Sequence, residues 1–164
     1  MASTSNTNNS DRAPPGHTPA RRSPTDSSYY DFDGVPYDNE KPNSATWMYA
    51  RDARAQQAGI PTARMKSRYP SKFRNSPDNV ELSTPGTPGY KNNPEWLHHP
   101  LIPGTTKTYT SGPPGAVRSV YTKGNPNEFD VMHHDPKAGT SPRGDHLFAK
   151  SHYYPAAQQE RSQR

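Results

Sequence analysis

The chain of 164 residues contains no cysteine, which excludes disulfides, thiolate metal ligands and thiol nucleophiles together. Hydrophobic residues make up only 27% of it. Even with its 11 glycines, this stays well below the roughly 45–50% of typical globular domains. No run approaches the about 20 apolar residues that a membrane span needs. We therefore expect a small core and no membrane partner.

The proline content and the aromatic content predict different degrees of order. The 20 prolines favour long irregular segments, whereas aromatic residues make up 10% of the chain and lie only between Tyr29 and Tyr154. We expect a folded domain at 30–154, flanked by a disordered arm at 1–29 and a polar tail at 155–164. The arm has no apolar segment of the kind that a secretory signal contains, so as written the chain is expected to be intracellular.

The elements alternate with proline- and glycine-rich connections. Ser44 as a cap and Gly59 as a stop predict a helix at about 45–58. Short runs of strand-forming residues follow at 95–102, 107–110, 116–122, 128–134 and 146–151. The order predicts an α+β fold: one N-terminal helix packed on a twisted antiparallel sheet of four to five strands, with long loops and disordered termini.

Two histidine pairs, His98-His99 and His133-His134, lie in predicted strands. Neighbouring side chains of a strand point to opposite faces, so neither pair can line one site, and we expect no metal or other cofactor. One interpretation is that these are polar residues at strand ends. The other is that one histidine of each pair shares a face with Arg118, a set suited to phosphoryl transfer.

Several blocks of the sequence, in order, carry a resemblance to a known family. They are "ARAQQAG" (53–59), "YPSKFRN" (69–75), "HHPLIPG" (98–104), "GPPGAVRSVYT" (112–122) and "FDVMHHD" (129–135). Together they resemble the fungal guanyl-specific ribonucleases and the related ribotoxins, small α+β proteins with one helix on an antiparallel sheet. The family's disulfide cysteines are missing here, and the loop between His134 and Leu147 is longer than usual.

The resemblance implies four catalytic positions. Arg118 falls on the family's phosphate-binding arginine, His134 on its general-acid histidine and Tyr69 on its active-site tyrosine. His98 aligns with the glutamate that acts as base. The remaining catalytic histidine of the family is replaced by Ser71.

The implied substrate-binding positions match the family less well. Asn75 is kept, but Ser76 and Pro77 replace the stacking tyrosine and the acid, with Asp78 one place late. Leu147 falls on the final-strand position at which the nucleases have phenylalanine and the ribotoxins leucine. The substrate-binding set that follows from the resemblance is Lys72, Phe73, Arg74, Asn75, Asp78 and Leu147.

A net charge of +5 suits an anionic partner, and the resemblance makes that partner RNA. It implies a monomeric, metal-independent endoribonuclease that cleaves single-stranded RNA after guanine to a 2′,3′-cyclic phosphate, with a protein inhibitor or the ribosome as further partners. The alternative is a catalytically impaired module of this kind that binds RNA or a protein. A third interpretation, a disordered adaptor regulated by kinases, is motivated by "RRSP" and "STPGTP".

Overall fold

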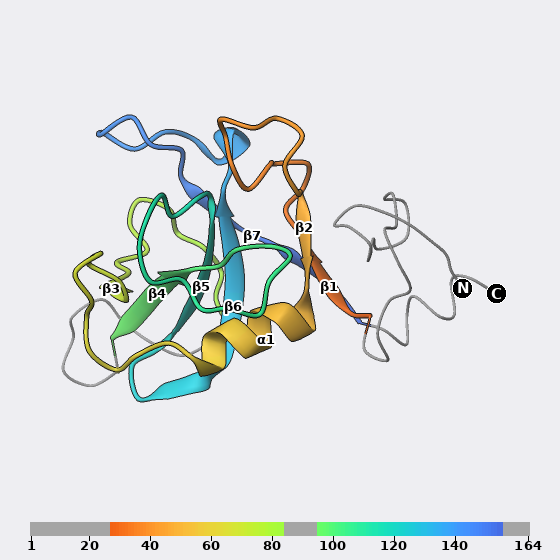
Figure 1. Ribbon diagram of the computed structural model, residues 1–164. Helices are drawn as coiled ribbons and strands as arrows, with labels where there is room; N and C mark the ends of the chain where they lie inside the picture. Colours follow the sequence, from red (N-terminus) through yellow and green to blue (C-terminus); the bar gives the residue numbers. More distant parts are fainter. Residues whose placement is uncertain (1–26, 84–94, 156–164) are drawn as a thin grey trace.

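The computed structural model describes residues 27–83 and 95–155. The terminal segments predicted to be disordered lie outside this part of the chain, except for their inner ends. Eight strands and one α-helix are present in the described part (Figure 1). No helix in it is long and apolar enough to cross a membrane.

The strands form two antiparallel sheets. The first has three strands in the order β2-β1-β8, and the second has five in the order β3-β4-β5-β6-β7. Their bounds are β1 Tyr29–Asp31, β2 Trp47–Tyr49, β3 Ser71–Lys72, β4 Trp96–Pro100, β5 Val117–Thr122, β6 Asn125–His134, β7 Phe148–Lys150 and β8 His152–Tyr154. A short 3₁₀ turn, Pro136–Ala138, follows β6.

The predicted α+β fold with one helix on one sheet is therefore wrong: the described residues are mostly β, with two sheets and a single short helix. The three-stranded sheet was missed because each of its strands has only three residues, too few to show alternation. The predicted strand at 107–110 is also wrong.

The helix α1, Ala50–Ala58, is shorter than the predicted one. Trp47, at the start of β2, pairs with Asp31 of β1, because bulky aromatic side chains pack better on a sheet. Ser44 is not the cap. Its hydroxyl donates to the carbonyl of Lys41 and accepts from the amide of Asp38. The stop at Gly59 is confirmed.

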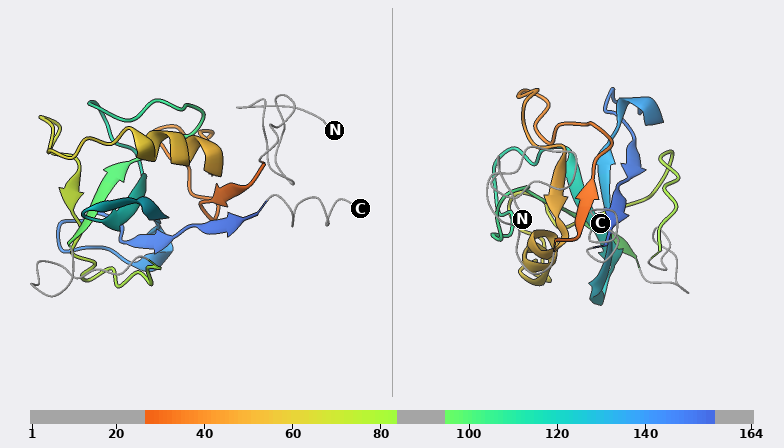
Figure 2. Two further views of the ribbon diagram at one scale, coloured as in Figure 1. Left: turned by 90° about the horizontal axis from the view of Figure 1, so that it is seen from below. Right: turned by 90° about the vertical axis from the view of Figure 1, so that its right-hand side faces the viewer.

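Apolar residues cover both faces of the five-stranded sheet. One cluster joins the sheet to α1 and the first strands, and it comprises Phe32, Met48, Ala53, Leu101, Val117 and Val131. The other comprises Phe73, Val80, Val120, Met132 and Phe148. Figure 2, right, shows α1 and the segment after β3 on opposite sides of the strands. The second cluster forms the floor of the candidate site.

Candidate active site

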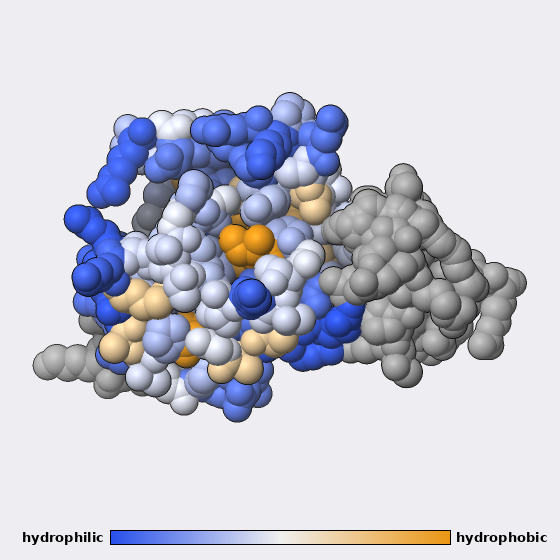
Figure 3. All heavy atoms as spheres, in the orientation of Figure 1, coloured by the Kyte–Doolittle hydropathy of each residue, from blue (hydrophilic) through white to orange (hydrophobic). Residues whose placement is uncertain are grey.

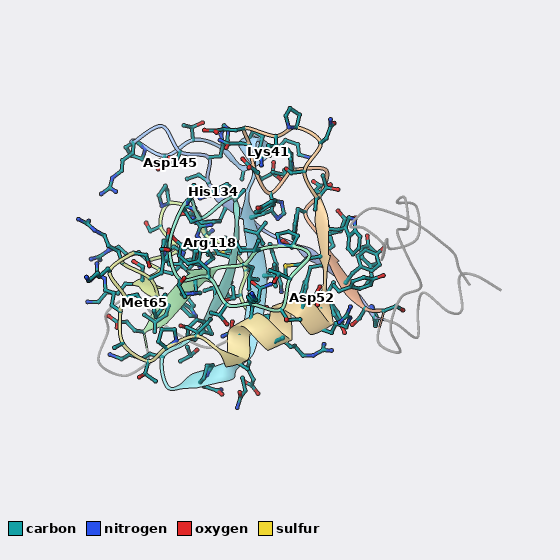
Figure 4. The ribbon with its side chains drawn as sticks, viewed as in Figure 1. Lys41, Asp52, Met65, Arg118, His134 and Asp145 are labelled. Atoms are coloured by element: carbon teal, nitrogen blue, oxygen red, sulfur yellow. The ribbon has the colours of Figure 1, made fainter. Side chains whose placement is uncertain are left out.

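Three neighbouring strands bring His98, Arg118 and His134 to one face of the five-stranded sheet. Arg118 of β5 is opposite Pro100 on one side and Met132 on the other. Each histidine lies two residues along from these partners, so the three side chains form a diagonal row with Arg118 in the middle. Figure 4 shows Arg118 and His134 close together inside the molecule.

The other histidine of each pair, His99 or His133, lies on the face opposite this row, as alternation predicts. His99 is fully buried, and its Nε2 lies 2.9 Å from the carbonyl oxygen of Tyr109. His133 is buried beside Phe32. His99 and His133 thus have structural roles in the core, whereas His98 and His134 lie beside Arg118.

Phe148 of β7 links the members of the row. Its ring stacks on His134 at 3.9 Å between centroids and meets the edge of His98 at 6.0 Å. The guanidinium carbon of Arg118 lies 5.9 Å from the centre of the same ring. Phe148 therefore holds both imidazoles and the guanidinium in fixed relative positions.

Tyr69 reaches the row from the loop before β3. Its hydroxyl accepts a hydrogen bond from Nη2 of Arg118 at 3.2 Å, and its ring meets His98 edge-on at 5.5 Å. The four residues to which the resemblance assigns catalysis thus lie in one cluster.

Arg118 is buried, with 4% of its surface exposed. Its Nη1 donates to the carbonyls of Gly115 at 2.8 Å and Val117 at 3.1 Å. Within residues 27–83 and 95–155, Nε has no partner and no carboxylate pairs with the guanidinium. A buried charge without a counter-ion is costly, so this position favours an incoming anion.

Gly115 provides one of the backbone carbonyls that surround the guanidinium of Arg118. Its φ of 70° lies in the left-handed region, and a Cβ there would come within 2.9 Å of the carbonyl oxygen of Tyr37. Only glycine satisfies both conditions. The "GPPGA" loop can therefore present its carbonyls to Arg118.

His134 has a defined tautomer. Its Nδ1 lies 2.5 Å from the carbonyl oxygen of His146, and since a carbonyl only accepts, Nδ1 carries a proton. Nε2 then holds the exchangeable proton. Burial lowers the pKa of His134 below its usual value, although the bond to His146 opposes this.

His98 is strongly biased towards its neutral form. Burial, and then repulsion by Arg118, His134 and His99, lowers the pKa of its imidazole to about 3. Its Nδ1 is buried without a hydrogen-bond partner in the described part of the chain. Neutral His98 can accept a proton, but its low pKa makes it a weak base.

The predicted substrate-binding residues are spread out. Phe73 is buried in the floor beside His98, whereas Lys72 and Arg74 are exposed, with Lys72 3.3 Å from Glu95. Asn75 closes its own loop through two hydrogen bonds with Val80.

Asp78 and Leu147 also contact other residues of the chain. A carboxylate oxygen of Asp78 accepts from the amide of Phe148 at 2.7 Å. Leu147 lies beside Gly139 in the loop after β6, while its neighbour Phe148 occupies the position next to His134. Sequence reasoning missed Phe148. In the register of β6 and β7, Phe148 and not Leu147 is opposite His134. The sequence alone does not give this register.

Ser151, His133 and Asp135 have the composition of a hydrolytic triad. The Ser151 hydroxyl is 2.7 Å from Nδ1 of His133, whose Nε2 is 3.5 Å from Asp135. All three are at least 95% buried, and Nε2 of His133 has no hydrogen-bond partner among the described residues, so the hydrogen-bonded relay that would activate the serine is incomplete. This arrangement joins the end of β6 to Ser151, the residue between β7 and β8, and is structural.

Comparisons with known proteins leave the resemblance as an expectation. No protein-family model, no curated protein and no solved structure matches the chain. Within the described residues, no group of three or more histidine, aspartate or glutamate side chains is arranged to hold a metal ion. The geometry of the cluster is therefore the basis for assigning a function to this chain.

The histidines make stability depend on pH. The folded-state pKa of His98, about 3, is below the unfolded value near 6.5, so the unfolded chain binds more protons between these pH values. The free energy of unfolding should therefore be fully maintained above about pH 6.5 and fall as the pH drops towards 3. His99, His133 and His134 shift in the same direction. Urea unfolding from pH 4 to 7 measures this slope.

The matched variants are His98→Gln and His152→Gln, the latter at an exposed histidine. Loss of His98 should make the slope shallower by up to about 1.4 kcal/mol per pH unit. Loss of His152 should change it much less. Equal slopes in wild type and His98→Gln would contradict the assigned burial of this imidazole.

Proposed function

We propose that the chain is a metal-independent endoribonuclease that cleaves single-stranded RNA by transesterification. The observation that carries this proposal is the buried guanidinium of Arg118, which has no carboxylate partner in the described residues and lies between two imidazoles. A phosphodiester supplies the missing negative charge. The flanking imidazoles are placed for proton transfer on either side of it.

In the proposed reaction, neutral His98 takes the proton of a ribose 2′-hydroxyl, and the oxygen attacks phosphorus in line. The Nε2 proton of His134 passes to the departing 5′-oxygen, which leaves a 2′,3′-cyclic phosphate. Arg118 and Tyr69 stabilise the charge on the pentacoordinate phosphorus. Phe148 keeps the acid in position by stacking on it.

The same geometry supports a second candidate, a module that binds RNA without cutting it. The low pKa of His98, about 3, makes proton abstraction slow near neutral pH. Ser71, opposite His98 in β3, has no proton-transfer group at neutral pH. Guanine recognition has little support, since Asn75 and Asp78 bond to the protein's own backbone.

Incubation with defined single-stranded RNAs, with and without EDTA, separates the two candidates. Wild type and the double variant His98→Ala/His134→Ala should bind a 2′-O-methyl oligonucleotide alike, because Arg118 remains. The wild type alone should cleave the matching RNA, to ends carrying a 2′,3′-cyclic phosphate. Tight binding with no cleavage by either protein would favour the binding module, and cleavage by the double variant would eliminate this mechanism.

A further inference from the structure

The segment that follows α1 and includes β3 carries an unusual concentration of positive charge. Residues 61–74 contain five lysines and arginines and no acid: Arg64, Lys66, Arg68, Lys72 and Arg74. The other 15 of the chain's 20 basic residues are matched by its 15 aspartates and glutamates. This segment, here called the basic turn, thus accounts for the whole net charge.

All five basic side chains of the turn are exposed. Nitrogen-tipped side chains project outward around Met65 in Figure 4, and hydrophilic residues cover the corresponding edge of the surface in Figure 3. Among the described residues, only Lys72 of the five forms an ion pair, with Glu95. The other four cations are therefore exposed and form no ion pair with any described residue.

The basic turn has a defined shape and leads directly into the candidate active site. The amide of Met65 donates to the carbonyl of Tyr69 at 2.8 Å, and Nε of Arg64 donates to the carbonyl of Arg68 at 3.3 Å. Arg68 has a φ of 77°, a conformation that arginine rarely adopts. This sharp bend directs the next residue, Tyr69, towards Arg118 while the basic side chains stay outside.

We infer that the basic turn binds the sugar–phosphate backbone of single-stranded RNA on one side of the phosphodiester held by Arg118. The inference rests on the proposed function for the chemistry at Arg118. The turn offers guanidinium and ammonium groups, which pair with phosphates, and neither of its aromatic residues, Tyr69 and Phe73, is exposed, so we expect it to recognise phosphates with little dependence on base identity. It extends the substrate class from a dinucleotide to a longer strand.

Binding of a 2′-O-methyl 12-mer, which cannot be cleaved, tests this inference by fluorescence anisotropy at several salt concentrations. Each phosphate contact to a single strand contributes about 0.7 to the slope of log K against log salt. The triple variant Arg64→Gln/Lys66→Gln/Arg68→Gln should make this negative slope shallower by about 2. It should also weaken binding at least about tenfold at low salt. The matched control, Lys41→Gln/Lys107→Gln/Lys123→Gln, removes the same charge at exposed positions elsewhere and should change the slope much less.

Equal losses of RNA affinity and of salt dependence in the two triple variants would overturn the inference, since they would show a general effect of net charge. So would an unchanged slope in the basic-turn variant. Binding to the uncleavable strand is measured without catalysis, so absence of cleavage would count against the proposed function alone. If cleavage occurs, the basic-turn variant should lose kcat/KM on a 12-mer RNA and keep it on a dinucleoside monophosphate.

Discussion

Replacing His134 with alanine is expected to lower the rate of RNA cleavage by about 10²–10⁴-fold, the range that a general acid contributes. The Nδ1 bond to the His146 carbonyl leaves Nε2 as the proton donor, and no other histidine stacks on Phe148 in the same way in the described part of the chain. Single-turnover cleavage of a defined RNA, with the product ends identified, measures the loss.

The pH profile gives this prediction a second readout. Wild-type cleavage should fall as the pH rises past the lowered pKa of His134, because the acid form disappears. Its acidic limb should lie near pH 3, where His98 gains a proton, so the optimum is acidic. His134→Ala should lose the alkaline limb.

The matched control for His134 is His152→Ala, at an exposed histidine of β8. Its cleavage rate and thermal melt should equal those of the wild type. Full activity of EDTA-treated His134→Ala protein would exclude the proposed acid.

Replacing Arg118 with glutamine is expected to reduce kcat/KM for RNA by about 10²–10³-fold, as for other groups that stabilise a developing oxyanion. The same change should abolish binding of inorganic phosphate. In the wild type, phosphate should raise Tm because it binds the folded chain at the uncompensated guanidinium. Differential scanning fluorimetry across a phosphate series at constant ionic strength measures this shift.

Arg143→Gln provides the control for Arg118. This arginine is exposed in the loop that follows β6, so its loss removes the same charge without touching the carbonyl ring around Arg118. Its phosphate-dependent shift of Tm should match that of the wild type. An undiminished shift in Arg118→Gln would place the anion elsewhere and remove the main support for the proposed function.

Local patterns in the sequence predicted the strand cores well. The expected strands at 95–102, 116–122 and 128–134 contain β4, β5 and most of β6, because these runs are long enough to show strand-forming composition. The three-stranded sheet has no such signal. β1, β2 and β8 are three residues long and far apart in the chain, so only their pairing reveals them.

In the candidate site, too, local sequence patterns predict some features and long-range strand pairing decides the others. Strand alternation alone separates His98 from His99 and His134 from His133, because the backbone pleat places successive side chains on opposite faces. Alternation cannot say which strands are neighbours. The diagonal row through Arg118 exists because β4, β5 and β6 are adjacent in this register.

The sequence by itself determined the chemical inventory: no thiols, a small core, divided histidine pairs and a net positive charge concentrated in the basic turn. Only the tertiary structure decided how these groups meet. It buries Arg118 without a carboxylate partner in the described residues, lowers the pKa of His98 to about 3 and stacks Phe148 on His134. Burial and long-range register depend on contacts between residues distant in the chain, and a local sequence pattern does not contain them.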